Sequence, residues 1–87
     1  MKIDFRKITV SDIEGNPIEL DVSKELGNDM YFNTQDIAES DLGYDIYHNG
    51  EVELTDEQAK TVARFVEKGF KAFVKKALLP MLEKKND

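Results

Sequence analysis

Three side chains with acid–base or metal-binding chemistry share one face of a helix predicted over residues 34–48. Asp41, Asp45 and His48 are spaced four and three residues apart, and His48 is the only histidine of the chain. Carboxylate and imidazole groups at this spacing can exchange protons or bind a metal ion. However, a histidine in the last turn of a helix is stabilised by the helix dipole, and aspartates on an exposed helix face are ordinary. We therefore interpret the three side chains as a solvated helix face.

Residues 45–56 match part of the calcium-binding loop of an EF-hand. Asp45 stands at the first position of that pattern, Gly50 at the sixth and an acid at the last. Tyr47 occupies the third position, where an oxygen ligand is needed, and Asp56 replaces the longer glutamate. A glycine that ends one helix, followed by a short strand and a capped helix, explains the same residues without a metal. We predict no metal site here, and calcium binding is the alternative.

The sequence holds no complete motif for catalysis or nucleotide binding. A Ser-His-Asp arrangement, a glycine-rich phosphate loop and a His-Glu-x-x-His pattern are all missing, and the five glycines are scattered along the chain as turn and cap residues. We therefore predict that the protein is not an enzyme and uses no cofactor or small-molecule substrate.

The charges of the chain are sorted by position. Residues 1–57 hold 15 of the 18 acids and only 4 of the 12 bases. Beyond them, five bases recur every three or four residues and form what we call the basic stripe: Lys60, Arg64, Lys68, Lys71 and Lys75. On a helix, this spacing places all five on one face. Such a face can bind phosphates or an acidic partner. It is also the solvated face that any long amphipathic helix needs.

No aromatic residue interleaves with the basic stripe, and the rest of the chain is acidic. Nucleic-acid binding through the stripe is therefore the alternative to our main prediction, and an acidic mimic of DNA that inhibits another protein is a second alternative. A separate feature is the recurrence of Phe65, Ala72 and Leu79 every seven residues, off both the basic and the apolar faces. These side chains either widen the core or form a seam with a second copy or a protein partner.

The elements that would position these residues suggest one small domain spanning residues 1–87. Alternation predicts a hairpin between Lys2–Val10 and Ile18–Val22 with one buried face, and a bulge near Arg6 and Lys7 would bring the apolar residues of the first strand to that face. A short helix from Ser23 to Leu26 would end at Gly27. The second helix would be capped by Thr34 and stopped at Asn49-Gly50, and Val52 and Leu54 would form a short third strand.

A long amphipathic helix is expected to follow. Thr55 and Gln58 have the spacing of a capping box, which places the helix start at residue 55 or 56. A buried stripe recurs every three or four residues: Ala59, Val62, Ala63, Val66, Phe70, Phe73, Ala77 and Met81. Pro80 should kink or restart the helix, and residues 84–87 should fray. The sequence therefore predicts an α+β fold in which a long C-terminal helix packs on the sheet.

Composition limits where the protein acts. The chain has no cysteine, its net charge is −6, and its N-terminus lacks the apolar core of a secretory signal. Its longest apolar run, residues 77–82, is far shorter than the roughly 20 residues that span a bilayer. We expect a soluble cytoplasmic protein without a membrane partner.

Three segments carry a resemblance to known proteins: KIDFRKITVSDIEG, DVSKELGNDMYF and DIYHNGEVELTDEQA. Across most of residues 2–60, the chain resembles small, mostly uncharacterised proteins carried by phages and mobile elements of Bacteroides-type bacteria. The resemblance implies an accessory role and transfers no functional residue. Together with the missing catalytic motifs, it leads us to predict a non-enzymatic interaction protein that acts by protein contact through the C-terminal helix.

Overall fold

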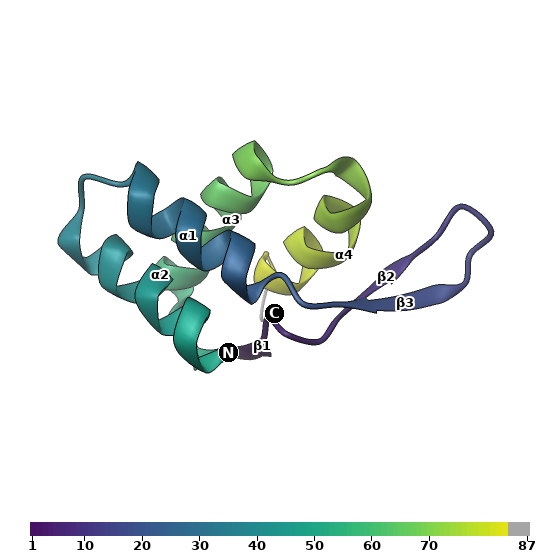
Figure 1. Cartoon of the computed structure of the whole chain (residues 1–87), viewed down its shortest axis with the longest axis horizontal. Coiled ribbons are helices and arrows are strands. Elements are labelled where there is room, and N and C mark those ends of the chain that lie inside the picture. The colour runs from purple at the N-terminus through teal and green to yellow at the C-terminus, as the bar shows by residue number, and fades with distance from the viewer. Residues whose placement is uncertain (84–87) are drawn as a thin grey trace.

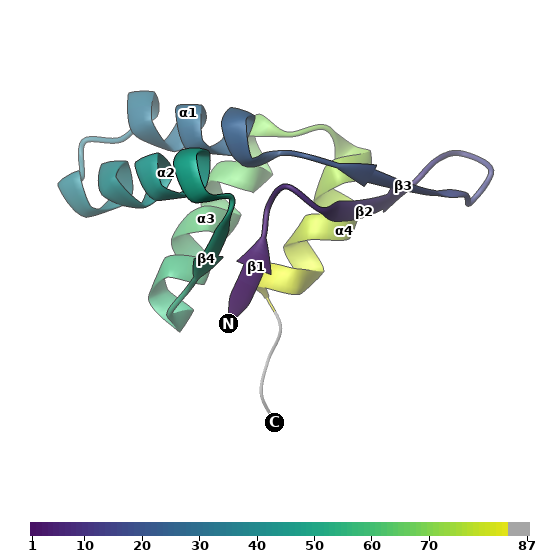
Figure 2. The ribbon, with the colours of Figure 1, turned by 60° about the horizontal axis from the view of Figure 1, so that its bottom comes forward.

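The structure, a computed structural model, describes residues 1–83 and belongs to the α+β class. Its elements follow in the order β1 (Lys2–Asp4), β2 (Ile8–Ser11), β3 (Pro17–Leu20), α1 (Ser23–Asn33), α2 (Ile37–Asn49), β4 (Glu51–Glu53), α3 (Asp56–Gly69) and α4 (Ala72–Leu82). The α1–α2 pair forms a layer over α3, α4 and the short β1 and β4 strands, while the β2–β3 hairpin extends from one side (Figures 1 and 2).

The strands form two separate antiparallel pairs. The predicted hairpin is confirmed over β2 and β3, where Ile8 lies opposite Leu20. The first residues of the chain do not continue this hairpin, because β1 pairs with β4 and Ile3 lies opposite Val52. A turn closed by the Lys7 N–H, which donates to the Asp4 carbonyl at 3.1 Å, replaces the predicted bulge. The apolar residues on both sides of this turn are buried, as the prediction required.

The burial predicted for β3 is wrong in part. Val22 is buried, but Ile18 is exposed and Leu20 only half-buried. The cause is the position of the β2–β3 hairpin, which projects from the body of the molecule (Figure 2). Its outer part therefore has no core to pack against.

The glycine predicted to end a short helix lies inside a longer one. Helix α1 continues through Gly27 to Asn33. Its first turn is held by Asp21, whose carboxylate accepts hydrogen bonds from the Ser23 N–H at 3.0 Å and from the Ser23 hydroxyl at 2.6 Å. The glycine is retained in the helix because α2 packs closely against it, as described below.

Helix α2 begins later than predicted and ends where predicted. Its N-cap is Asp36 rather than Thr34, and the Asp36 carboxylate accepts the Glu39 N–H at 3.1 Å. At the other end, Gly50 has a φ of 73° and its N–H donates to the Ile46 carbonyl at 3.0 Å. Positive φ favours glycine, so the stop at this residue was visible in the sequence.

The junction between β4 and α3 agrees with the prediction. The third strand is present as β4. The Thr55 hydroxyl accepts the Gln58 N–H at 3.1 Å, while the Gln58 side-chain oxygen accepts the Thr55 N–H at 2.9 Å. The predicted capping box therefore forms in full and starts α3 at Asp56.

The long C-terminal helix predicted to pack on the sheet is wrong, because two shorter helices replace it. Helix α3 ends at Gly69, and Phe70 and Lys71 are extended, with ψ angles of 155° and 157°. Glycine is among the poorest helix formers, and the buried Phe70 ring anchors the turn that follows. The helix does not restart at Pro80, because α4 continues through that residue to Leu82.

The break shifts the buried face of the second half by one position. The predicted stripe is buried at Ala59, Val62, Val66 and Phe70, with Ala63 partly buried. In α4 the buried residues are Val74, Leu78 and Leu82 instead of Phe73, Ala77 and Met81. Phe73 is 46% exposed and Met81 39% exposed. Two extended residues reset the helical phase, and α4 folds back against β2 and α3.

One hydrophobic cluster joins buried residues of the strands and the four helices named above. In the described range, none of the helices combines the length and the apolar character needed to cross a membrane. The predicted fraying of residues 84–87 lies outside the described residues.

Candidate functional site

The structure divides the basic stripe between two helices and their junction. Its members lie on α3, before α4 and within α4, in the order Lys60, Arg64, Lys68, then Lys71, then Lys75. Arg64 Nη2 is 2.9 Å from Glu39 Oε2 of α2. Lys75 Nζ donates to the Glu67 carbonyl oxygen at 2.9 Å and lies 3.5 Å from the carboxylate of the same residue. The five bases therefore share no single helix face, and two of them contact acids of the protein itself.

The residues of the predicted seam are also separated by the helix break. Phe65 lies on α3, whereas Ala72 and Leu79 lie on α4. Phe65 and Leu79 are partly buried and pack against the core, and Ala72 is exposed. The positions of Phe65 and Leu79 favour the interpretation that these two side chains widen the core.

The residues that match a calcium loop do not form a loop. Asp45 lies in α2, where it accepts a hydrogen bond from the Asn49 side-chain amide. Glu51 and Glu53 lie on β4, and Asp56 is the first residue of α3. Over residues 1–83, no three histidine, cysteine or acidic side chains are grouped so that they could hold a metal ion.

The histidine of α2 belongs to an aromatic group. The centroid of the His48 ring lies 4.3 Å from that of Tyr44 and 5.0 Å from that of Tyr47. Asp41 and Asp45 are exposed on the same helix. The contacts of His48 are thus aromatic, whereas the sequence predicted only a solvated helix face for these three residues.

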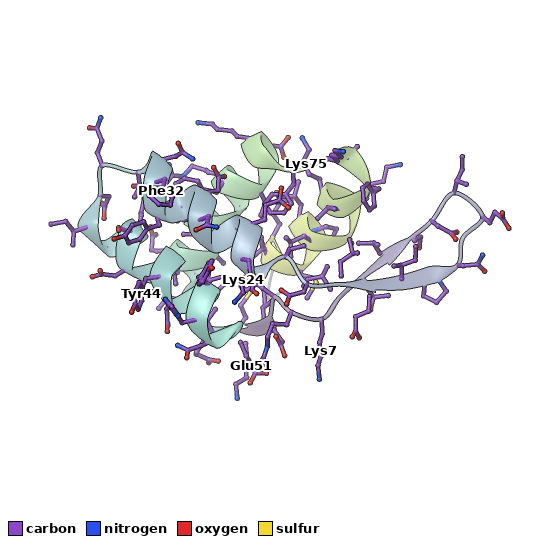
Figure 3. The ribbon with its side chains drawn as sticks, in the orientation of Figure 1. Lys7, Lys24, Phe32, Tyr44, Glu51 and Lys75 are labelled. Carbon is purple, nitrogen blue, oxygen red and sulfur yellow. The ribbon has the colours of Figure 1, made fainter. Side chains whose placement is uncertain are left out.

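These rings form part of a larger surface on the outer side of α1 and α2. We call it the aromatic surface; it comprises Tyr31, Phe32, Tyr44, Tyr47 and His48, which line a hollow of about 200 Å³ together with Gly27 and Asn28. Phe32 is 74% exposed and Tyr44 58% exposed. Figure 3 shows these two side chains on the two helices. The aromatic surface is the strongest candidate for a binding site because large aromatic side chains are exposed together around a concavity.

Two glycines position the aromatic surface. A Cβ atom on Gly27 would lie 2.7 Å from the Gly43 carbonyl oxygen and 2.7 Å from Tyr47 Cβ. A Cβ atom on Gly43 would lie 2.8 Å from Met30 Cβ and 2.9 Å from the Gly27 carbonyl oxygen. The helices can approach this closely only because neither residue has a side chain. Their close contact brings the rings of the two helices to one hollow.

One end of the aromatic surface already holds a cation. Lys24 Nζ lies 4.3 Å from the centroid of the Tyr47 ring and donates to the Tyr47 carbonyl oxygen at 3.4 Å. At the other end, the Tyr31 and Phe32 rings meet edge to face, with centroids 5.2 Å apart. The surface therefore combines an apolar end with an end whose ring face accommodates an ammonium group.

Sequence reasoning missed this surface. It placed Tyr31 and Phe32 after a helix stop at Gly27, so the two rings had no helix face to share. Once α1 is continuous, Gly27 and Tyr31 are four residues apart on α1, as Gly43 and Tyr47 are on α2. This repeated glycine–tyrosine spacing was the signal available in the sequence.

Known proteins give no guide to the fold or to the aromatic surface. Searches of protein-family models, curated proteins and solved structures found no match to the chain. The resemblance to mobile-element proteins therefore stays a prediction, and the function must be argued from the site itself.

Proposed function

We propose that this chain is a non-enzymatic interaction protein that binds a partner protein through the aromatic surface of α1 and α2. The observation that carries the proposal is the clustering of exposed apolar side chains. Within residues 1–83, four of the eight exposed large apolar side chains belong to this helix pair: Tyr31, Phe32, Ile37 and Tyr44. Contiguous exposed apolar side chains of this kind mark interaction sites.

The proposal also has an energetic basis. Full burial of a phenylalanine side chain is worth about 1.5–3 kcal/mol, and most of this free energy is forgone by Phe32 in the isolated chain. A partner that covers Phe32 and Tyr44 recovers it. Tyrosine and phenylalanine are enriched at protein interfaces for this reason, and tyrosine is frequent among the residues that dominate binding energy.

An accessory role in a phage or mobile element, acting in the cytoplasm, is part of this proposal. The support for the accessory role is the resemblance of residues 2–60 described above. Neither the position of the aromatic surface nor its chemistry depends on that origin.

The nucleic-acid alternative has less support. The basic stripe is divided, and Arg64 and Lys75 contact Glu39 and Glu67. Nucleic-acid binding through the stripe would weaken steeply with added salt and after charge reversal. If labelled DNA and RNA show no retardation at low salt, this alternative is removed. The DNA-mimic alternative rests only on the acidic first two thirds of the chain.

The test is a selection of short random peptides displayed on phage against the immobilised chain. We expect peptides that bind the wild-type chain and lose at least about tenfold in affinity, or about 1.4 kcal/mol, in the Phe32→Ser, Tyr44→Ser double variant. Phe73→Ser is the matched control, because Phe73 is also an exposed phenylalanine but lies on α4, in a groove beside the β2–β3 hairpin.

Thermal unfolding of each variant must first show that it folds. Peptides that bind the double variant as tightly as the wild type contradict the proposal. If the peptides fail to bind the Phe73→Ser variant instead, the interaction takes place on α4. A selection without any binding peptide also counts against the proposal, since a preformed aromatic hollow should capture short ligands.

A further inference from the structure

We infer that the partner of the aromatic surface is a basic peptide segment, whose arginine or lysine side chains lie against the tyrosine rings while neighbouring apolar side chains cover Phe32. This inference rests on the proposed function and adds the chemistry of the partner. It is carried by a cation that the protein itself places on the surface, by the charge around the rings, and by the apolar end of the hollow.

The first observation is the contact between Lys24 and Tyr47. The Lys24 ammonium lies over the Tyr47 ring, 4.3 Å from its centroid. At an exposed site, attraction between a cation and the face of a tyrosine ring changes an affinity by about two- to fivefold. Lys24 is exposed, and Figure 3 shows it on α1, next to the helix α2 that carries Tyr44. The protein thus shows, with one of its own side chains, which kind of group a ring of this surface takes.

The second observation is the charge of the helix pair. Residues 23–49 contain six acids and Lys24 as their only lysine or arginine. Asp41 and Asp45 are exposed, and they precede Tyr44 and His48 by three residues, which places them beside those rings on α2. Acids next to exposed rings attract a positive side chain and repel phosphate or an acidic peptide. Charge and aromatic faces therefore favour the same class of ligand.

The third observation concerns the apolar end of the hollow. Tyr31 and Phe32 are both exposed, line the hollow and meet edge to face on the last turn of α1. A single cation would leave these side chains in water. A segment that carries both basic and apolar residues covers the two ends at once, which is why a peptide fits the surface better than a small cation.

Lys24 acts as an internal competitor in this arrangement. Its ammonium covers the Tyr47 face that a ligand cation would use, and its charge opposes a second cation nearby. Replacing Lys24 by glutamine removes the charge and leaves a polar, uncharged side chain. We expect Lys24→Gln to tighten the binding of a basic peptide by about two- to fivefold, the equivalent of one exposed cation–ring contact. A purely structural lysine would have no such effect.

The experiment uses two synthetic peptides and the full chain. One is a short peptide of alternating leucine and arginine, and the other has every arginine replaced by citrulline, which is similar in shape but uncharged. Isotope-labelled protein is titrated with each, and amide chemical shifts give both the affinity and the location. We expect the arginine peptide to shift amides of α1 and α2 and the citrulline peptide to bind at least about tenfold more weakly.

The variants sharpen the result. Lys24→Gln should tighten the binding, whereas Tyr47→Leu should weaken it. The double variant Asp41→Asn, Asp45→Asn should weaken it by about threefold, as expected for exposed charges. Lys76→Gln is the control for Lys24→Gln, because Lys76 is an exposed lysine of α4 on the side of the β2–β3 hairpin. Equal tightening by Lys76→Gln would show that only net charge matters and would overturn the role of Lys24.

Failure of this inference is distinguishable from failure of the proposed function. If displayed peptides require Phe32 and Tyr44 but are neutral or acidic, the aromatic surface is an interaction site and the basic partner is wrong. Equal binding of the citrulline and arginine peptides leads to the same conclusion. If the arginine peptide shifts amides over α3 and α4, or anywhere without preference, the inferred site is wrong.

Discussion

Helices α1–α2 and α3–α4 are two consecutive pairs that pack on the same core, but their outer faces differ in chemistry. The pair α3–α4 turns most of its bases to solvent, and some of these contact acids of the protein itself. The pair α1–α2 turns aromatic rings to solvent around a hollow. A charged outer face is stable in water without a partner, whereas an exposed phenylalanine is not at its lowest free energy there. The comparison therefore supports our proposal that a partner binds at α1–α2, whereas the charged outer face of α3–α4 is solvated.

The two pairs also differ in how their helices meet. Gly27 and Gly43 let α1 and α2 approach until their backbones are in contact. On α3 and α4, larger apolar side chains such as Val66 and Leu78 fill the core instead. One pair depends on the absence of side chains and the other on their volume. Added side-chain volume should therefore destabilise α1–α2, whereas removed side-chain volume should destabilise α3–α4.

The largest predicted effect tests the volume-filled pair. Leu78 of α4 is fully buried, so Leu78→Ala should lower the free energy of unfolding by about 2–5 kcal/mol through lost burial and a cavity. Met81 is exposed, although a continuous helix would have buried it. Met81→Ala should therefore lower the free energy of unfolding by less than about 1 kcal/mol. Denaturant unfolding of both variants measures the difference. A larger loss for Met81→Ala would contradict the phase of α4.

The next effect tests the glycine-packed pair. Gly27→Ala and Gly43→Ala would each place a methyl group within 3 Å of backbone or Cβ atoms of the other helix, so we expect a loss of about 1–3 kcal/mol from overpacking. This loss opposes the gain of about 1 kcal/mol that alanine normally brings to a helix interior. Denaturant unfolding again gives the net value.

Gly69→Ala is the matched control for these substitutions. Its methyl group would meet only the carboxylate of Asp29, a side-chain end that can move. Its stability should change by less than about 0.5 kcal/mol. If Gly27→Ala and Gly43→Ala stabilise the protein as an ordinary helix glycine-to-alanine change does, the close approach of α1 and α2 is wrong.

The comparison also explains what the sequence revealed and what it did not. The α+β class, the β2–β3 hairpin, β4, the capping box at Thr55 and the stop at Gly50 were all predictable. Each depends on alternation, on a cap or on a glycine with positive φ, which are properties of a few adjacent residues. The candidate site was not predictable in the same way, because it depends on two helices meeting.

The errors have physical causes at particular residues. A glycine inside a helix costs only about 1 kcal/mol, so Gly27 and Gly69 look alike in the sequence although one lies within α1 and the other ends α3. Packing decides between the two outcomes. Gly27 is kept helical by its contact with Gly43, whereas the chain leaves the helix at Gly69 and buries Phe70 in the core.

A smaller effect tests whether α3–α4 presents a seam. Phe65 is half-buried against the core, so Phe65→Asp should lower the free energy of unfolding by about 1 kcal/mol or more. The hydrodynamic size measured by size-exclusion chromatography should stay the same. A soluble protein of smaller hydrodynamic size would instead show that α3–α4 holds two copies together, and the contrast between the two pairs would be lost.

The smallest predicted effect is a difference between the two helix pairs in how their first turns respond to acid. Asp21 lies just before helix α1, and its pKa is below the ordinary value because its carboxylate accepts hydrogen bonds from the Ser23 hydroxyl and N–H. A folded-state pKa below the unfolded value of about 3.9 contributes stability at higher pH, and that stability is lost as the pH falls through the folded value. Helix α3 instead begins with the hydrogen bonds of Thr55 and Gln58, two groups that do not titrate.

Acid should therefore loosen the first turn of α1 before that of α3. Amide chemical shifts and hydrogen exchange followed below about pH 4 should show the Ser23 amide losing its hydrogen bond, while the Gln58 amide keeps its bond to the Thr55 hydroxyl. Asp21→Asn keeps an oxygen acceptor but removes the titration, so the Ser23 shift should lose its pH dependence in this variant. If the Ser23 amide still titrates in Asp21→Asn, another carboxylate controls the start of α1. Loss of both first turns at the same pH would mean that the two helix pairs unfold as one unit. The pairs would then differ only in the chemistry of their outer faces.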